Sequence, residues 1–342
     1  MLRMFRPLPL ASALVVLLGT AAFAPSKKKP AGPDYQAIVE RAYNTVQNVT
    51  EGKNADYIPA LAEVPSDLFG MALVTVEGQV FATGDLNSEV SIQSISKVFT
   101  LARVIDEKGA EVIVEKVGVD ATGEVFNSIT AIERMKGREI NSCVNPGAIA
   151  TTSLIAGNTY EAKWNNILST HSDFAGRSLS VNGPVYESEA ATNQRNQAIA
   201  HLLFAYDRMY WDPVQTTDLY TKQCAINVNA KDLATMAATL ANGGKNPITK
   251  KTVVGPVAAQ HTLSVMATAG LYDDSGIWLY RVGLPGKSGV GGGLIAVCPG
   301  KFGIAVIAPP LDAAGNSVKG QRAITQVVEE LKANLYRVEP KP

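Results

Sequence analysis

Ser94-Ile95-Ser96-Lys97 stands at the start of a segment whose apolar spacing predicts a helix over 94–107. The segment ends at Lys108-Gly109, a cation followed by a glycine stop. Three residues along a helix place the lysine on the face of the serine. A lysine amine can act as the base that a serine hydroxyl needs if burial lowers its pKa. Ser94 is therefore a candidate nucleophile, although the pattern alone also fits a helix N-cap.

A second motif, Lys287-Ser288-Gly289, lies in the glycine-rich stretch 286–293, just before a predicted strand. K-[ST]-G accompanies S-x-x-K in β-lactamases and penicillin-binding proteins, where the strand lines the active site. The glycines indicate a close backbone approach, either to a ligand or to another segment. The S-D-N motif of those enzymes is missing, since Ser180-Val181-Asn182 is only a partial match in a predicted loop.

Periodicity along the chain predicts an α+β protein. Short β-rich runs lie toward both ends of the sequence, at 68–76, 79–83, 277–282, 293–297 and 302–308. The clearest helical patterns cover 34–47, 196–209, 230–241 and 319–335. The economical architecture is one antiparallel sheet built from both chain ends and flanked by helices, with a helical lobe inserted between them.

Composition narrows the function classes. The chain has 342 residues with 31 basic and 31 acidic side chains, so no charge excess points to nucleic acid. Three widely spaced cysteines make no disulfide framework and show no activating pattern, so we interpret them as structural. The three histidines lack metal-ligand spacing, and we therefore expect neither a metal nor a cofactor.

The first 24 residues have the pattern of a secretory signal peptide. Arg3 and Arg6 precede an apolar run over 10–24, and Ala22-Phe23-Ala24 resembles a cleavage site. The run is shorter than the roughly 20 residues of a membrane-spanning helix, which disfavours an uncleaved anchor. We expect a leader over 1–24, a polar linker over 25–35, and a periplasmic or secreted protein, with the cytoplasm as the alternative.

Colinear motifs spread over roughly residues 36 to 336 resemble the serine-dependent glutaminase family, which shares the β-lactamase-like fold. The matching stretches are Ala55–Ala62, Ser91–Val98, Phe126-Asn127-Ser128, Val144-Asn145, Gly147-Ala148-Ile149, Ser188-Glu189, Arg195-Asn196, Gly270–Asp273, Val282–Gly293, Leu311-Asp312 and Gly315-Asn316-Ser317. The resemblance implies one catalytic domain over 36–337. Its sheet lobe would span about 36–115 and 275–337, and its helical lobe about 116–274.

The resemblance also implies the site. Ser94 would be the nucleophile, Lys97 its base, and Tyr220 the relay of a proton to the leaving ammonia. L-Glutamine would be bound by Tyr57, Ser94, Asn145, Glu189, Asn196, Tyr220, Tyr272 and Val290. Glu189 suits the α-ammonium, the asparagines and tyrosines suit the α-carboxylate, and the backbone N–H groups of Ser94 and Val290 suit an oxyanion. A homo-oligomer, a dimer or a tetramer, is also expected.

One departure from the family pattern lies at Asn145-Pro146, where the family usually has Asn-Ala. We expect Pro146 to restrict Asn145 to extended dihedrals and so to alter its pose. Two alternatives to a glutaminase stay open. A β-lactamase or a peptidoglycan peptidase is favoured by the paired motifs and by export. A catalytically inactive ligand-binding protein is supported by Pro146 alone.

Overall fold

The computed structural model describes residues 1, 32–137 and 140–340 of the chain. Within these residues, a five-stranded antiparallel sheet has the order β2-β1-β7-β6-β5. The strands are β1 (Gly70–Thr75), β2 (Val80–Gly84), β5 (Gly286–Ser288), β6 (Gly293–Cys298) and β7 (Phe302–Ile307). Strand β1 pairs with β7 along its whole length, so the two ends of the chain form a single sheet, as the sequence predicts.

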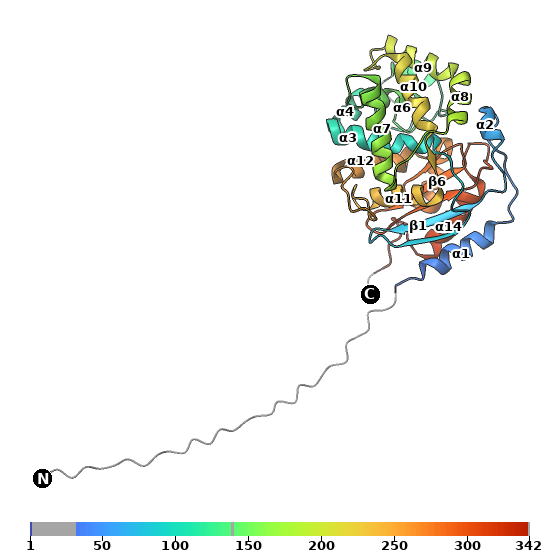
Figure 1. Cartoon of the computed structure of the whole chain (residues 1–342), viewed down its shortest axis with the longest axis vertical. Helices are drawn as coiled ribbons and strands as arrows, with labels where there is room; N and C mark the ends of the chain where they lie inside the picture. Colours follow the sequence, from blue (N-terminus) through green and yellow to red (C-terminus); the bar gives the residue numbers. More distant parts are fainter. Residues whose placement is uncertain (2–31, 138–139, 341–342) are drawn as a thin grey trace. The chain divides into compact units, whose positions relative to one another are not determined.

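Alternating side chains of the strands enter two different cores. Met71 and Leu73 pack with apolar residues of α1 (Tyr35–Val46) and α14 (Val318–Glu330) on one face. Ala72 and Val74 pack on the other face, where α11 (Ala230–Ala241) lies. In Figure 1, α1 lies below β1 and α11 lies above it. A sheet buried on both faces explains why these strands read as continuous apolar runs.

Helix α11 approaches the sheet very closely. A Cβ placed on Gly303 of β7 would lie 2.1 Å from the backbone nitrogen of Ala238, so only glycine fits there. The alanines of α11 give it the narrow surface that this approach needs. Although α11 falls in the range 116–274 that the sequence assigns to the helical lobe, it covers the sheet.

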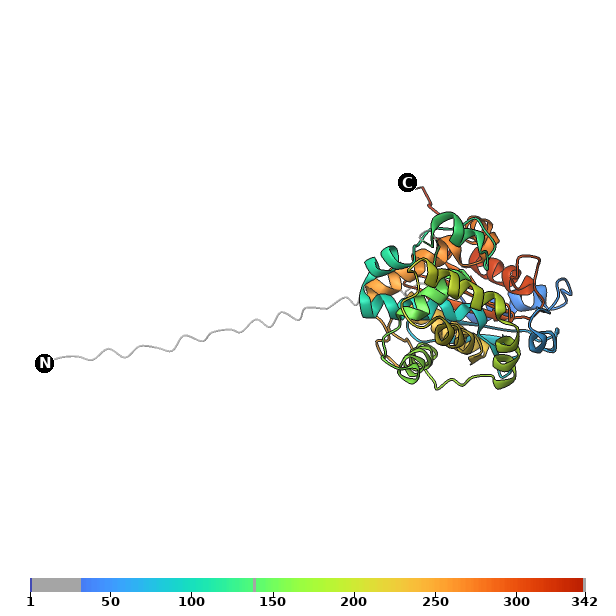
Figure 2. The ribbon, with the colours of Figure 1, turned by 90° about the horizontal axis from the view of Figure 1, so that it is seen from above.

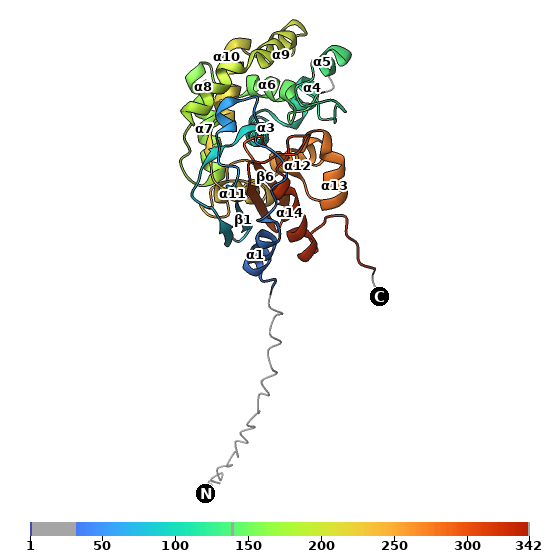
Figure 3. The ribbon, with the colours of Figure 1, turned by 90° about the vertical axis from the view of Figure 1, so that its right-hand side faces the viewer.

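The helical layer beside this sheet is built around α3 (Ser96–Lys108), which packs against α6, α7 and α12. Its other helices are α4 (Ala110–Lys116), α5 (Thr130–Met135), α6 (Asn145–Leu154), α7 (Tyr160–Ala175), α8 (Gly183–Thr192), α9 (Gln194–Ala205), α10 (Pro213–Cys224) and α12 (Pro256–Ala269). Seen from above, the green and yellow helices lie in front of most of the sheet (Figure 2), and Figure 3 shows them on the side of the sheet away from α1.

Two local predictions need correction. Residues 277–282, predicted as a β-rich run, belong to helix α13 (Ser275–Val282), which ends at Gly283 in the left-handed conformation. A six-residue apolar run cannot distinguish the two, and the glycine stop was the better signal. The helix predicted from Ser94 begins at Ser96, because Gln93–Ile95 forms a 3₁₀ turn. The Lys287 motif lies just before strand β6, as predicted, and its first two residues also belong to β5.

The leader and most of the linker predicted for the N-terminus lie outside the described residues. Among the helices that the structure describes, none is long and apolar enough to cross a membrane.

Candidate functional site

Segments from across the sequence meet around a cavity of about 220 Å³. Of the eight predicted substrate-binding residues, seven line it: Tyr57, Ser94, Asn145, Glu189, Asn196, Tyr220 and Val290. The eighth, Tyr272, packs beside it in one apolar cluster with Val290. A larger groove of about 730 Å³ between α13 and α14 contains none of the predicted residues.

Lys97 lies in the first turn of α3 and is fully buried behind the cavity. Its Nζ donates to Asn145 Oδ1 at 2.7 Å and is 3.5 Å from the carbonyl oxygen of Cys143. Burial lowers the pKa of this amine to about 8. The neutral amine that a serine nucleophile needs is therefore accessible near neutral pH, although in this structure the amine is bonded to Asn145 rather than to Ser94.

Asn145 connects the polar groups of the site. Its Oδ1 also accepts from the Tyr220 hydroxyl at 3.1 Å, and its Nδ2 donates to Asn196 Oδ1 at 2.9 Å. The prediction that Pro146 forces Asn145 into an extended conformation is wrong, because Asn145 is the first residue of α6. A proline in the first helical turn removes an N–H that has no intrahelical acceptor in any case.

Glu189 is 7% exposed, so it is a buried carboxylate and not a surface charge. Gln93 Nε2 donates to its Oε2 at 3.2 Å. Burial is the largest influence on this carboxyl group and raises its pKa to about 7. A buried carboxylate with one side-chain donor retains acceptor capacity for a cation, which suits the ammonium group assigned to it.

The turn after β5 packs tightly against the segment that carries Ser94. A Cβ on Gly289 would lie 2.8 Å from the carbonyl oxygen of Ile92, and one on Gly291 would lie 2.5 Å from that of Ser91. The close approach predicted from the glycines is therefore present. The N–H groups of Ser94 and Val290 bond to no backbone acceptor in the described part of the chain, which leaves both free for an oxyanion.

The two other predicted tyrosines, Tyr272 and Tyr57, lie at different depths of the site. Tyr272 has a positive φ of 53° and donates its hydroxyl to the Ser288 carbonyl oxygen at 3.1 Å. The Lys287 ammonium lies 4.3 Å from the centre of the Tyr272 ring and donates to the same Ser288 carbonyl oxygen at 2.8 Å. The Lys287 motif therefore contacts Tyr272 through both its lysine and its serine. Tyr57 is 54% exposed and forms the rim of the cavity.

Sequence reasoning missed several lining residues: Ile58, Gln93, Phe126, Asn127, Thr192, Asn193 and Arg195. Five of them, Ile58, Gln93, Phe126, Asn127 and Arg195, stand inside the matching motifs, so a signal for them existed. The positive φ of 49° at Gln93 had no signal in the sequence. Strained backbone of this kind gathers at functional sites. No cluster of metal-ligating side chains occurs among the residues that the structure describes.

Ser94 lines the cavity, Lys97 of the same S-x-x-K motif is buried, and both stand on an α+β fold with one antiparallel sheet, which is the arrangement of the serine-dependent hydrolases of the β-lactamase-like class. The family model described as Glutaminase matches residues 52–336, and the chain belongs to the glutaminase family.

Relatives and solved structures agree with this membership. A glutaminase of Colwellia psychrerythraea (strain 34H) is 52% identical over 309 residues, which cover 90% of this chain and 99% of that protein. A glutaminase of Brucella canis is 52% identical over 301 residues, with coverages of 88% and 95%. A solved structure described as a probable glutaminase has a TM-score of 0.88 at 44% identity, covering 89% of this chain and 98% of that one.

Proposed function

We propose that this protein hydrolyses L-glutamine to L-glutamate and ammonia through an acyl-enzyme on Ser94. Membership of the glutaminase family gives the reaction. The observation that carries the mechanism is that Ser94 and the buried carboxylate of Glu189 line the same small cavity. An amino acid can then bind by its α-ammonium while its side-chain amide lies at the nucleophile.

In the acylation step, Ser94 Oγ attacks the amide carbon of glutamine while neutral Lys97 takes the hydroxyl proton. The amide oxygen becomes an oxyanion that the N–H groups of Ser94 and Val290 stabilise. The bond between carbon and nitrogen then breaks, and ammonia leaves with a proton delivered through Tyr220. Two observations support this role: Tyr220 lines the cavity together with Ser94, and its hydroxyl and Lys97 Nζ both contact Asn145 Oδ1, so the two groups lie close together.

In the deacylation step, a water molecule attacks the ester carbon and gives its proton to Lys97. The ester bond breaks, the proton returns to Ser94 Oγ, and glutamate is released. One water is consumed for each glutamine, and no oxidant or cofactor is required for the balance.

The dimensions and charge of the cavity distinguish glutamine from the substrates of β-lactamases and peptidases. A volume of about 220 Å³ lies below the roughly 300–1,000 Å³ of sites for drug-sized ligands. A β-lactam has no need of a buried acidic partner, whereas the α-ammonium of an amino acid needs one. Asn145, Asn196 and the tyrosines supply donors for the α-carboxylate.

The decisive experiment is Ser94→Ala, assayed for ammonia release from glutamine, with asparagine and a cephalosporin in parallel. Losing the covalent route should lower the rate by on the order of a thousandfold or more without unfolding the protein. Ser96→Ala is the matched control, because Ser96 is buried in the same motif but does not line the cavity. Near-normal activity in folded Ser94→Ala would exclude this mechanism.

Two further features belong to the proposal and rest on the sequence. The N-terminal pattern over 1–24 supports export to the periplasm or the medium. We also propose a homo-oligomer, a dimer or a tetramer, on the family resemblance. Size-exclusion chromatography with light scattering measures that state, and a monomer at all working concentrations would contradict it.

A further inference from the structure

Helix α8 carries Glu189 but has little apolar surface to hold it in place. Its buried residues are only Val185 and Glu189 itself. Removing a carboxylate from water is unfavourable, so burying Glu189 tends to push the helix outward. The buried side chain of Val185 and the partly buried ring of Tyr186 are the apolar contacts that oppose this tendency. The depth of α8 must therefore be fixed by polar contacts with its neighbours.

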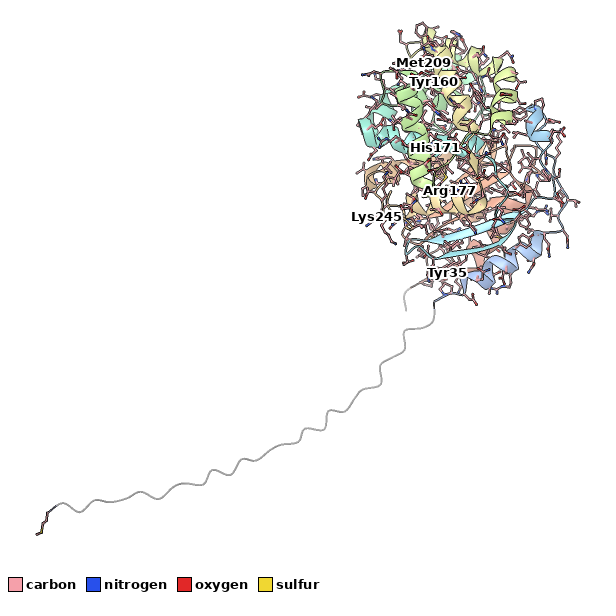
Figure 4. The ribbon with its side chains drawn as sticks, viewed as in Figure 1. Tyr35, Tyr160, His171, Arg177, Met209 and Lys245 are labelled. Atoms are coloured by element: carbon pink, nitrogen blue, oxygen red, sulfur yellow. The ribbon has the colours of Figure 1, made fainter. Side chains whose placement is uncertain are left out.

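Asp218 on α10 provides such a contact. Its Oδ1 accepts a hydrogen bond of 2.6 Å from the hydroxyl of Tyr186, which lies on α8 one turn before Glu189. Its Oδ2 accepts from the hydroxyl of Tyr160, the first residue of α7. Figure 4 labels Tyr160 in the helical layer, far from Tyr35 at the sheet. One carboxylate thus joins α7, α8 and α10.

The other contacts of α8 fix different parts of it. Asn182 caps its N-terminus and donates from Nδ2 to Asn227 Oδ1 at 3.1 Å. Ser188 Oγ accepts from the backbone N–H of Ala60 at 3.2 Å, on the side of α2 (Pro59–Ala62). In the described part of the chain, the bond from Tyr186 to Asp218 is the one side-chain hydrogen bond to α10 from a residue inside α8. At the C-cap of α8, Asn193 Nδ2 also donates to Thr221 Oγ1 of α10 at 3.0 Å, which holds that end of the helix.

We propose that Asp218 is a positioning residue for substrate binding: through Tyr186 it holds α8 at the depth where Glu189 faces the cavity. This inference rests on the proposed role of Glu189 as the acceptor of the substrate ammonium. A carboxylate is suited to the task because hydrogen bonds to a charged acceptor are about twice as strong as neutral ones. Asp218 acts on KM for glutamine and takes no part in the chemical step.

The two tyrosines give a matched pair of variants. Tyr186→Phe and Tyr160→Phe each remove one hydroxyl from the same carboxylate, but only Tyr186 lies on the helix that carries Glu189. Tyr186→Phe should raise KM about threefold to tenfold and change kcat by less than about twofold. Tyr160→Phe should shift the melting temperature comparably and change KM by less than about twofold. Equal changes of KM in both variants would overturn the proposal.

A double-mutant cycle tests whether Asp218 acts through Glu189. In a Glu189→Gln background, adding Tyr186→Phe should lower kcat/KM by less than about 1.5-fold, because the coupled contact is already lost. If Tyr186→Phe lowers kcat/KM by the same factor in the Glu189→Gln background as in the wild type, Asp218 does not act through Glu189. If Tyr186→Phe is too unstable to assay, Asp218→Asn replaces it in the same cycle, because asparagine keeps an acceptor oxygen while losing the charge.

The failure of this proposal is separable from that of the proposed function. If Glu189→Gln alone leaves KM for glutamine unchanged, the role of Glu189 is wrong. If Glu189→Gln impairs binding while Tyr186→Phe behaves like Tyr160→Phe, only the positioning role of Asp218 is wrong.

Discussion

Lys97 and Glu189 are both buried, and burial favours the uncharged form of each. The consequences for catalysis differ. A neutral Lys97 is the form that accepts the proton of Ser94, so burial assists its role. A neutral Glu189 cannot pair with an ammonium, so burial opposes its role until the pH is high enough to ionise it.

This contrast predicts the pH dependence of the enzyme. Glu189 must lose its proton near pH 7 and Lys97 must lose one near pH 8, so kcat/KM should rise through this range and be small at about pH 6. Glu189→Gln should remove the lower of the two transitions and leave the upper one. The measurement is kcat/KM for glutamine between about pH 5.5 and 9. A profile that is flat over that range would contradict both assignments.

Substitution of Glu189 should reduce activity strongly. Glu189→Gln keeps the shape of the side chain but removes its charge, and a charge-assisted hydrogen bond contributes roughly 1.5–3 kcal/mol. We expect kcat/KM for glutamine to fall about tenfold to a hundredfold. Steady-state kinetics on a protein shown to be folded by circular dichroism decides this. An unchanged kcat/KM would mean that the ammonium binds elsewhere.

The same variant should be more stable than the wild type at alkaline pH. The pKa of Glu189 is raised from 4.5 to about 7 in the folded state, so the folded protein binds this proton more tightly and loses stability as pH rises between these values. At about pH 8 the full penalty is on the order of 3 kcal/mol. Glu189→Gln should therefore raise the melting temperature at pH 8 and have little effect near pH 4.5.

At the scale of single elements, the N-terminus of α6 fixes the position of the Asn145 side chain in the site. Asn145 and Pro146 open the helix, and Asn145 reaches Lys97, Tyr220 and Asn196 from that position. The proline is accommodated because it stands in the first turn, where backbone N–H groups have no partner within the helix. The departure from the family pattern is therefore compatible with a functional site and gives no support to an inactive ligand-binding protein.

Pro146→Ala tests this interpretation. The substitution restores the alanine that the family usually has, and it should change kcat/KM by less than about twofold. It should destabilise the protein by about 0.4–1 kcal/mol, because proline restricts the unfolded chain. Kinetics and thermal melts of the two proteins provide the comparison. A large gain of activity in Pro146→Ala would show that the proline distorts the site after all.

At the scale of the whole molecule, four of the five strands could be predicted, because β1, β6 and β7 are apolar runs and β2 returns from β1 across a glycine-containing turn. Strand β5 was missed because its three residues, Gly286–Ser288, form no apolar run. Helix α13 was missed because its apolar run is too short to show a period. The close packing of α11 on β7 depends on Gly303, whose partner lies far away in the sequence. Contacts of this kind are set by tertiary structure and leave no local pattern.

The candidate site, like the sheet, could be predicted from the sequence only in part. Ser94, Lys97 and the binding residues could be predicted because they stand in contiguous motifs. The bond from Gln93 to Glu189 and the link from Asp218 to α8 could not, because each joins residues that only the fold brings together. The pKa shifts of Lys97 and Glu189 follow mainly from burial in the fold, so the motifs alone could not predict them either.

The final prediction concerns the N-terminal 24 residues, which are absent from the matched family region over 52–336. Their pattern of two arginines, an apolar run and Ala22-Phe23-Ala24 is typical of a cleaved leader. Expressed in full, the protein should be found in the exported fraction with its N-terminus near Pro25, as N-terminal sequencing after cell fractionation would show. Its kcat/KM should equal that of a chain starting at Asp34, because α1 is capped by Asp34 and needs no residue before it. An intact Met1 on active protein in the cytoplasm would overturn export without affecting the assignment of the active site.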